Sequence, residues 1–170
     1  LGIEFESTIL SNGVALSEDS IKRIVKEKIR LMISLDGIGE SHNSQRKFAN
    51  GKGSFDWVNR TINKTIALGL KPFISITITD HNVESLPETV AYVLSRDLPF
   101  NINFYRDTEC ASKPEELRLK DDQIIAAIEK VFQVIEANLP SHSLLGMLID
   151  RTSFAQAHEK TCGVGESYMV

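Results

Sequence analysis

Four times along the chain, a segment with the pattern of a β-strand is followed by a segment with the pattern of an amphipathic helix. Such units in series are typical of α/β folds, in which the strands run parallel and the crossovers are right-handed. The sequence therefore predicts a parallel sheet with helices packed against it. The predicted strands cover residues 4–10, 29–35, 71–79 and 100–105, and the predicted helices cover 18–28, 54–69, 80–96 and 121–139.

Local signals support these helices. Ser17 and Ser54 are predicted N-caps, and Pro87 fits the first turn of the third helix. The helix over 121–139 has the strongest apolar stripe, made of Ile124, Ile125, Ile128, Val131, Phe132 and Ile135. Residues 37–53 are predicted to be a long polar loop, and residues 144–160 one more helix or two short ones.

The predicted strands alternate between apolar and polar side chains. In the second strand Leu31, Ile33 and Leu35 oppose Met32, Ser34 and Asp36, and the next two strands show the same alternation. Parallel strands covered on both faces are usually apolar throughout. The pattern therefore predicts an open or partial barrel with a polar, ligand-holding face. An open antiparallel sheet with one face in water would alternate in the same way, but the helix after each strand favours the parallel arrangement.

Composition limits the classes of function. The chain has 170 residues, 42% of them hydrophobic, and a net charge of -4, which is ordinary for a globular protein. Clustered Lys and Arg are absent from the sequence, which argues against binding to nucleic acid or to an anionic membrane. The sequence shows neither a signal peptide nor an apolar run of membrane-spanning length, so we expect a cytoplasmic protein with no membrane partner.

The two cysteines, Cys110 and Cys162, lie too far apart in the sequence for a self-contained zinc site, and they do not form a disulfide framework. The chain begins without Met and ends on TCGVGESYMV, so we interpret it as an internal piece of a longer protein. Residues 1–140 are predicted to form the partial barrel, and residues 141–170 a helical linker followed by the start of a further region.

Several short motifs together resemble the radical S-adenosylmethionine (radical SAM) enzymes. These are SNG after the first strand, ISLDG, HNSQR, GKGSFDWV and SITITDHN, in the order and spacing of that family. The C-terminal TCGVGESYMV resembles the start of the SPASM extension. The resemblance covers residues 5–105 and 158–170, and is greatest to anaerobic sulfatase-maturating enzymes and to maturases of ribosomally made peptides.

The resemblance implies a fold, cofactors and partners. The fold would be a partial (β/α)₆ barrel, of which this chain holds about four strand-helix units. The cofactors would be S-adenosylmethionine, a [4Fe-4S] cluster and an auxiliary iron–sulfur cluster. The substrate would be a peptide or protein side chain, and the electron donor a protein such as flavodoxin or ferredoxin. The family's Cys-x₃-Cys-x₂-Cys motif does not occur in this sequence, so we expect the chain alone to be inactive.

The resemblance also implies site residues. Asn12, Ser34, Asp36, Arg46 and Thr77 match positions that line the S-adenosylmethionine site, with Thr79 a weaker candidate. Cys162, next to Gly163 and Gly165, matches a ligand of the auxiliary cluster. Other interpretations remain open: Asp36 as a turn residue before Gly37, Arg46 as an exposed loop arginine, and Cys162 as an inert buried thiol.

Two other functional classes fit the pattern. One is a noncatalytic α/β binding or scaffold domain that keeps the barrel geometry without a cluster. The other is a different barrel enzyme that acts on a phosphate or sugar. The four histidines, His42, His81, His142 and His158, have no spacing typical of a metal site and are predicted to lie on loop and helix surfaces.

Overall fold

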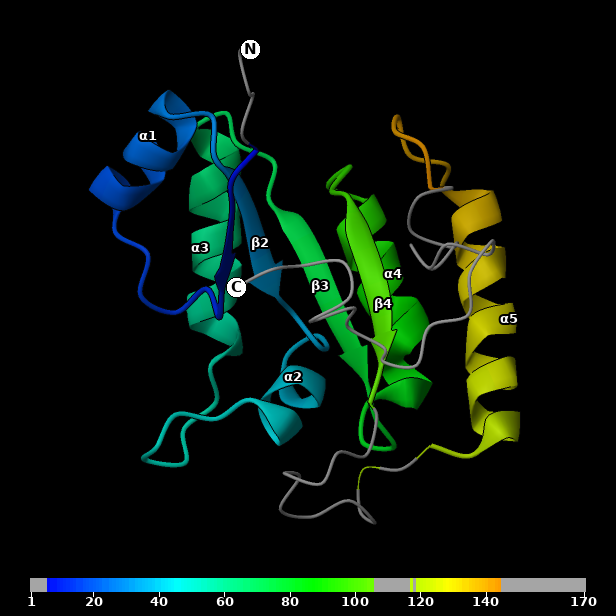
Figure 1. The fold of residues 1–170 in the computed structure, drawn as a ribbon. Helices are drawn as coiled ribbons and strands as arrows, with labels where there is room; N and C mark the ends of the chain where they lie inside the picture. The colour runs from blue at the N-terminus through cyan, green and yellow to red at the C-terminus, as the bar shows by residue number, and fades with distance from the viewer. Residues whose placement is uncertain (1–5, 106–116, 118, 145–170) are drawn as a thin grey trace, which may run out of the picture.

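The computed structural model describes residues 6–105, 117 and 119–144. Four parallel strands form one sheet in the order β1-β2-β3-β4, which is also their order along the chain (Figure 1). The strands are β1 (Thr8–Ser11), β2 (Arg30–Ser34), β3 (Phe73–Ile78) and β4 (Phe100–Phe104). The structure confirms the predicted α/β fold, in which each parallel strand is followed by at least one helix.

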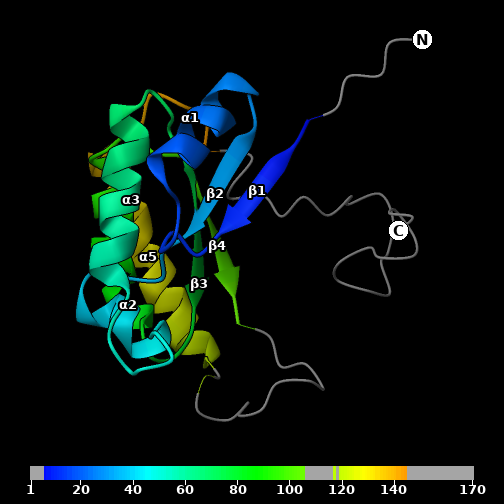
Figure 2. The same cartoon turned by 90° about the vertical axis from the view of Figure 1, so that its left-hand side faces the viewer.

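The helices cover one face of this sheet, as Figure 2 shows from the side. They are α1 (Glu18–Lys26), α2 (Glu40–Gln45), α3 (Phe55–Ala67), the 3₁₀ turn η1 (Val83–Ser85), α4 (Leu86–Leu94) and α5 (Asp121–Ala137). Helices α4 and α5 pack against each other, and α5 also contacts η1. No helix in the described part of the chain is long and apolar enough to cross a membrane.

The hydrophobic core lies between the sheet and the helices. The apolar side chains of β2 and β3 alternate with polar ones and are buried against the helices, as the sequence predicts. Val58 and Ile62 of α3 and Val90 and Val93 of α4 are fully buried on the other side of this core. Because the apolar faces of the strands and helices meet here, none of the described helices covers the polar face of the sheet.

Helix ends follow the sequence in part. Ser17 caps α1, since its Oγ accepts a hydrogen bond from Ser20 N at 3.1 Å, and Pro87 lies in the first turn of α4. Gly69 has a φ of 81°, a conformation that glycine adopts easily, and it ends α3 where a glycine is expected. Ser54 precedes α3, but its side chain makes no capping bond. Asn43 Oδ1 instead accepts from Phe55 N at 2.9 Å.

Two expectations about the helices are wrong. The predicted polar loop 37–53 contains the short helix α2, which ends before a turn closed by a bridge between Lys47 and Gly53. In α5, Ile125 and Phe132 are 59% and 54% exposed rather than buried, because only the side of α5 that faces α4 is covered. The predicted helix over 144–160 and almost all of the predicted region 141–170 lie outside the described residues.

Candidate functional site

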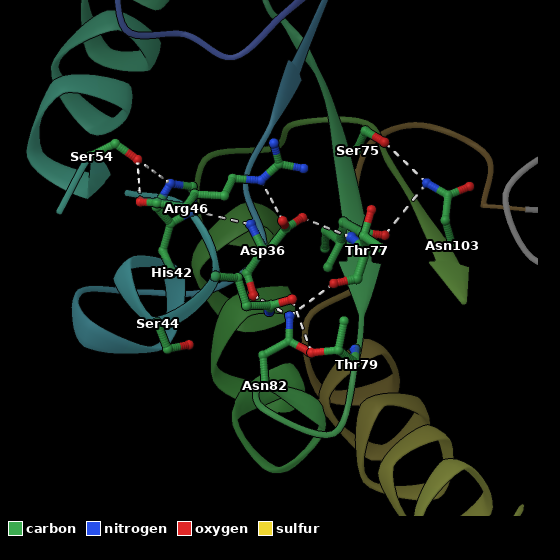
Figure 3. Close-up of polar contacts among 12 residues, drawn as sticks. Asp36, His42, Ser44, Arg46, Ser54, Ser75, Thr77, Thr79, Asn82 and Asn103 are labelled. Atoms are coloured by element: carbon green, nitrogen blue, oxygen red, sulfur yellow. Dashed lines mark hydrogen bonds and ion pairs between the residues drawn. The ribbon is translucent and has the colours of Figure 1, made fainter. Parts of the chain in front are cut away.

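The carboxyl ends of β2 and β3 bring together two of the predicted site residues. Asp36 follows β2 and is 4% exposed, and its Oδ1 accepts a hydrogen bond from the backbone N of Thr77 in β3 at 2.8 Å (Figure 3). Its Oδ2 accepts a hydrogen bond from Arg46 Nε. The carboxylate therefore contacts the neighbouring strand and Arg46, and makes no bond to the turn at Gly37.

Arg46 is held by one edge of its guanidinium group. Its Nε is bound to Asp36, while its two terminal nitrogens have no hydrogen-bond partner among the described residues and point away from Asp36 in Figure 3. The side chain is 33% exposed. A guanidinium that is fixed on one edge and open on the other can pair with a carboxylate through two parallel hydrogen bonds. The structure therefore brings Arg46, Asp36 and Thr77 into one cluster.

A buried histidine is hydrogen-bonded to this cluster. His42, in α2, is fully buried, so its predicted place on the surface is wrong. Its Nδ1 accepts a hydrogen bond from Asp36 N at 3.2 Å, which leaves the proton on Nε2 for a bond to Ser54 Oγ at 3.1 Å. Ser54 Oγ in turn donates to Arg46 O at 2.8 Å. This chain of bonds fixes the backbone of both charged residues.

The electrostatic state of His42 follows from its burial. Burial lowers the pKa of His42 from 6.5 to about 4, the Asp36 carboxylate opposes this shift, and the Arg46 guanidinium adds to it. The imidazole is therefore neutral at pH 7. A neutral ring is also what the hydrogen bonds require, because only the neutral form has the Nδ1 lone pair that accepts from Asp36 N.

Asn82 joins the two strand ends on the other side. Its Nδ2 donates to Asp36 O at 2.5 Å and to Thr77 O at 2.9 Å, and its Oδ1 accepts from Thr79 N at 2.8 Å. Asn82 is 2% exposed, so these bonds replace those that water would make. The amide therefore acts as a clamp that keeps the carboxyl ends of β2 and β3 in register.

The sheet face opposite the described helices carries a row of small polar groups. Ser34 lies opposite Ser75, and Asn103 Nδ2 donates to Ser75 Oγ at 3.0 Å (Figure 3). Asn101 Nδ2 donates to Asn103 Oδ1 at 3.3 Å. The Ser34 hydroxyl has no hydrogen-bond partner among the described residues, so it is available to a ligand. This face is the polar face that the strand alternation predicts.

Two further predicted residues, Asn12 and Thr79, lie at the ends of β1 and β3. Asn12 follows β1 and is exposed, and its Oδ1 accepts from Val14 N at 3.2 Å. Thr79 is 2% exposed, and its hydroxyl donates to Gln45 Oε1 at 2.9 Å, which ties the end of β3 to α2. Cys110 and Cys162 lie outside the described residues. Residues 6–105, 117 and 119–144 contain no group of three or more His, Cys, Asp or Glu side chains that could hold a metal ion.

Sequence reasoning missed His42, Ser54 and Asn82 as members of the site. His42 and Ser54 lie in or next to the segment interpreted as a polar loop, where no apolar periodicity marks a buried position. Asn82 belongs to the SITITDHN motif but was not singled out. The one available signal was the close spacing of Asp36, His42 and Arg46, because such a group of polar residues after a strand can fold back onto the strand's end.

Comparison with known proteins finds relatives by structure only. No protein-family model matches the chain, and no curated protein sequence matches it. The structure of native anSMEcpe, an anaerobic sulfatase-maturating enzyme with bound AdoMet, superposes with a TM-score of 0.68 at 20% identity, covering 75% of this chain and 36% of that one. SuiB from Streptococcus suis, bound to S-adenosylmethionine, gives 0.62 at 14% identity, covering 80% and 31%.

Sequence identities of this size show a shared fold and do not show a shared activity. The chain spans about one third of the length of these enzymes. Within this chain, the cluster of Asp36, Arg46 and Thr77 lies at the carboxyl edge of the parallel sheet. The described part of this chain has the fold of a partial radical SAM barrel.

Proposed function

We propose that the chain is the central part of a radical SAM enzyme that cleaves S-adenosylmethionine reductively and modifies a peptide or protein side chain. The observation that carries this proposal is the Arg46 guanidinium, which Asp36 holds beside the polar sheet face with its outer edge open. Two matched structures of anSMEcpe contain AdoMet together with a peptide, named Kp18Cys or Cp18Cys, which supports a peptide as substrate class.

The chemistry of the described residues fits S-adenosylmethionine. The open edge of Arg46 suits its carboxylate, while the Ser34 hydroxyl and the Asn12 amide can bond to its ammonium or ribose groups. Thr77 would contribute the wall of the site at β3. Asp36 would act mainly by positioning Arg46, because each of its carboxylate oxygens already accepts a hydrogen bond from the protein.

The sequence contains few candidate ligands for the iron–sulfur clusters. With the cofactor bound, a [4Fe-4S] cluster would supply the electron for cleavage, but its Cys-x₃-Cys-x₂-Cys motif does not occur in this sequence. We propose that these ligands lie elsewhere in a longer protein, that Cys162 is one ligand of an auxiliary cluster, and that the chain alone is inactive. Reduction would come from an electron-transfer protein such as flavodoxin or ferredoxin.

The absent cysteine motif also favours a second candidate function. A noncatalytic binding domain would keep the Arg46 site and bind an anionic ligand without any cluster. The decisive experiment is to sequence about 100 codons on each side of the coding region. We expect a Cys-x₃-Cys-x₂-Cys motif after one strand upstream and further cysteines downstream. Finding neither motif would overturn the radical enzyme and leave the binding domain.

Arg46→Ala is expected to weaken S-adenosylmethionine binding to the reconstituted parent protein at least tenfold, about 1.4 kcal/mol, because the carboxylate of the ligand loses a bidentate hydrogen-bond partner. Arg46→Lys keeps the charge but not the fork, so we expect an intermediate loss. Isothermal titration calorimetry measures both. Arg23→Ala, which removes an exposed arginine from α1, is the matched control and should bind as the parent does. Equal affinity in Arg46→Ala and the parent would remove Arg46 from the site.

A further inference from the structure

A second surface of the chain, on the helical side of the sheet, has the composition of a binding site. The loop 14–17 and helix α3 enclose a groove of about 290 Å³, close to the lower limit of the 300–1,000 Å³ that is usual for ligand pockets. We call it the α3 groove. It is lined by Val14, Ala15, Leu16, Ser17, Trp57, Arg60, Thr61 and Lys64.

Except for Thr61, which is 7% exposed, the α3 residues of this groove face away from the core. Trp57, Arg60 and Lys64 follow one another at helical spacing, while Val58 and Ile62 on the opposite side of the helix are fully buried. Trp57, the only tryptophan in the chain, is 50% exposed. A large aromatic side chain that stays half exposed on a helix whose core face is already filled is typical of a binding surface.

The charge of the groove is positive and is not neutralised within the described residues. Arg60 lies over the Trp57 ring, with its guanidinium carbon 5.2 Å from the ring centroid, and neither Arg60 nor Lys64 forms an ion pair there. The nearby Glu18 is paired with Lys22 at 2.7 Å and also attracts Lys64 without forming an ion pair with it. Two like charges four residues apart on a helix repel each other, so an anion in the groove would relieve this repulsion.

The wall opposite α3 is mostly apolar, apart from Ser17. Val14, Ala15 and Leu16 line it, while Phe48 packs edge-on against Trp57 with ring centroids 6.2 Å apart. An inorganic anion would gain nothing from an apolar wall, whereas a peptide can place an apolar side chain against Leu16 and Trp57 and carboxylates against Arg60 and Lys64. The groove is thus complementary to an acidic segment that also carries an apolar residue.

We propose that the α3 groove binds an acidic peptide segment of a partner protein, on the helical side of the sheet and separate from the polar sheet face. Recognition would combine an apolar anchor between Leu16 and Trp57 with ion pairs to Arg60 and Lys64. Because the net charge of the chain is -4, this local positive charge would also orient an acidic partner toward the groove.

The single tryptophan makes the proposal directly measurable. The 170-residue chain is titrated with an acetylated and amidated octapeptide of six glutamates around a central Leu-Leu pair, and the fluorescence of Trp57 is followed. We expect a saturable shift of the emission maximum that weakens as salt is raised, and none with the peptide in which glutamines replace the glutamates. No saturable shift, or equal shifts with both peptides, would overturn the proposal.

Variants test the two cations separately from the fold. Arg60→Gln/Lys64→Gln should weaken peptide binding at least tenfold, and Lys64→Gln alone by a smaller factor. Lys130→Gln is the matched control, because it removes an exposed lysine from α5, at the far end of the helical layer from α3 (Figure 1). Circular dichroism confirms that each variant folds. The proposal is overturned if the double variant binds the peptide with unchanged affinity. It is also overturned if inorganic phosphate shifts the Trp57 emission as much as the acidic peptide does.

Discussion

Asp36→Ala is expected to lower the free energy of unfolding by about 3 kcal/mol. The substitution leaves the Thr77 backbone N–H without its acceptor and removes the partner of Arg46 Nε. The loss is placed at the low end for a broken buried ion pair, because Arg46 is one third exposed and can turn toward water. Urea denaturation followed by circular dichroism measures the change at pH 7.

Two further variants separate this effect from the loss of a negative charge. Asp56→Ala removes an exposed carboxylate from the first turn of α3 and should change the free energy of unfolding by less than about 0.5 kcal/mol. Asp36→Asn keeps the shape of the side chain and an acceptor for Thr77 N, so it should be more stable than Asp36→Ala. It should be less stable than the parent, because its amide NH₂ group then faces the Arg46 Nε–H donor. If Asp36→Ala and Asp56→Ala cost the same, Asp36 does not hold the strand ends together.

Acidification from pH 6.5 to pH 4 is expected to remove about 3 kcal/mol of stability through His42 alone. Burial lowers the pKa of His42 to about 4 in the folded chain, while the unfolded chain titrates near 6.5. Between these two values the unfolded state binds more protons, so protonation favours unfolding. The contribution of His42 is therefore fully present above pH 6.5 and is lost as the pH falls toward 4.

The pH effect is isolated by comparing variants across the same range. His42→Gln cannot titrate, so its deficit relative to the parent should be greatest at pH 7 and shrink by about 3 kcal/mol at pH 4. His81→Asn, which replaces an exposed histidine, is the control variant. Comparison with the parent removes the effects of pH that the three proteins share. A deficit of His42→Gln that does not change with pH would show that the buried imidazole is not held neutral.

Much of the fold follows from patterns that are local in the sequence. Strand alternation predicts which side chains of β2 and β3 are buried, because the period of two is fixed by the geometry of the strand. Ser17 and Gly69 mark helix ends because each acts on its own backbone neighbours. The predicted apolar stripe of α5 includes side chains that are exposed, because the sequence does not tell how much of a helix its neighbours cover.

The site was predicted less completely, because its bonds are made across the chain. The sequence indicates that Asp36 and Thr77 end neighbouring strands, and parallel pairing places them side by side. The burial of His42 depends on how the segment 37–53 folds over those strand ends, which no periodicity reveals. Ser54 has the sequence of an N-cap, but its hydroxyl bonds to His42 and Arg46 instead, a choice that only tertiary structure decides.

The equal order of strands in the sheet and in the chain has a consequence for how the protein folds during synthesis. Each strand pairs with the one made just before it, so a growing chain can add one strand-helix unit at a time. The bond between Asp36 and Thr77 is different, because it spans 41 residues and can form only after the third strand has docked. We therefore expect an emerging chain to have an ordered sheet before it has a working site.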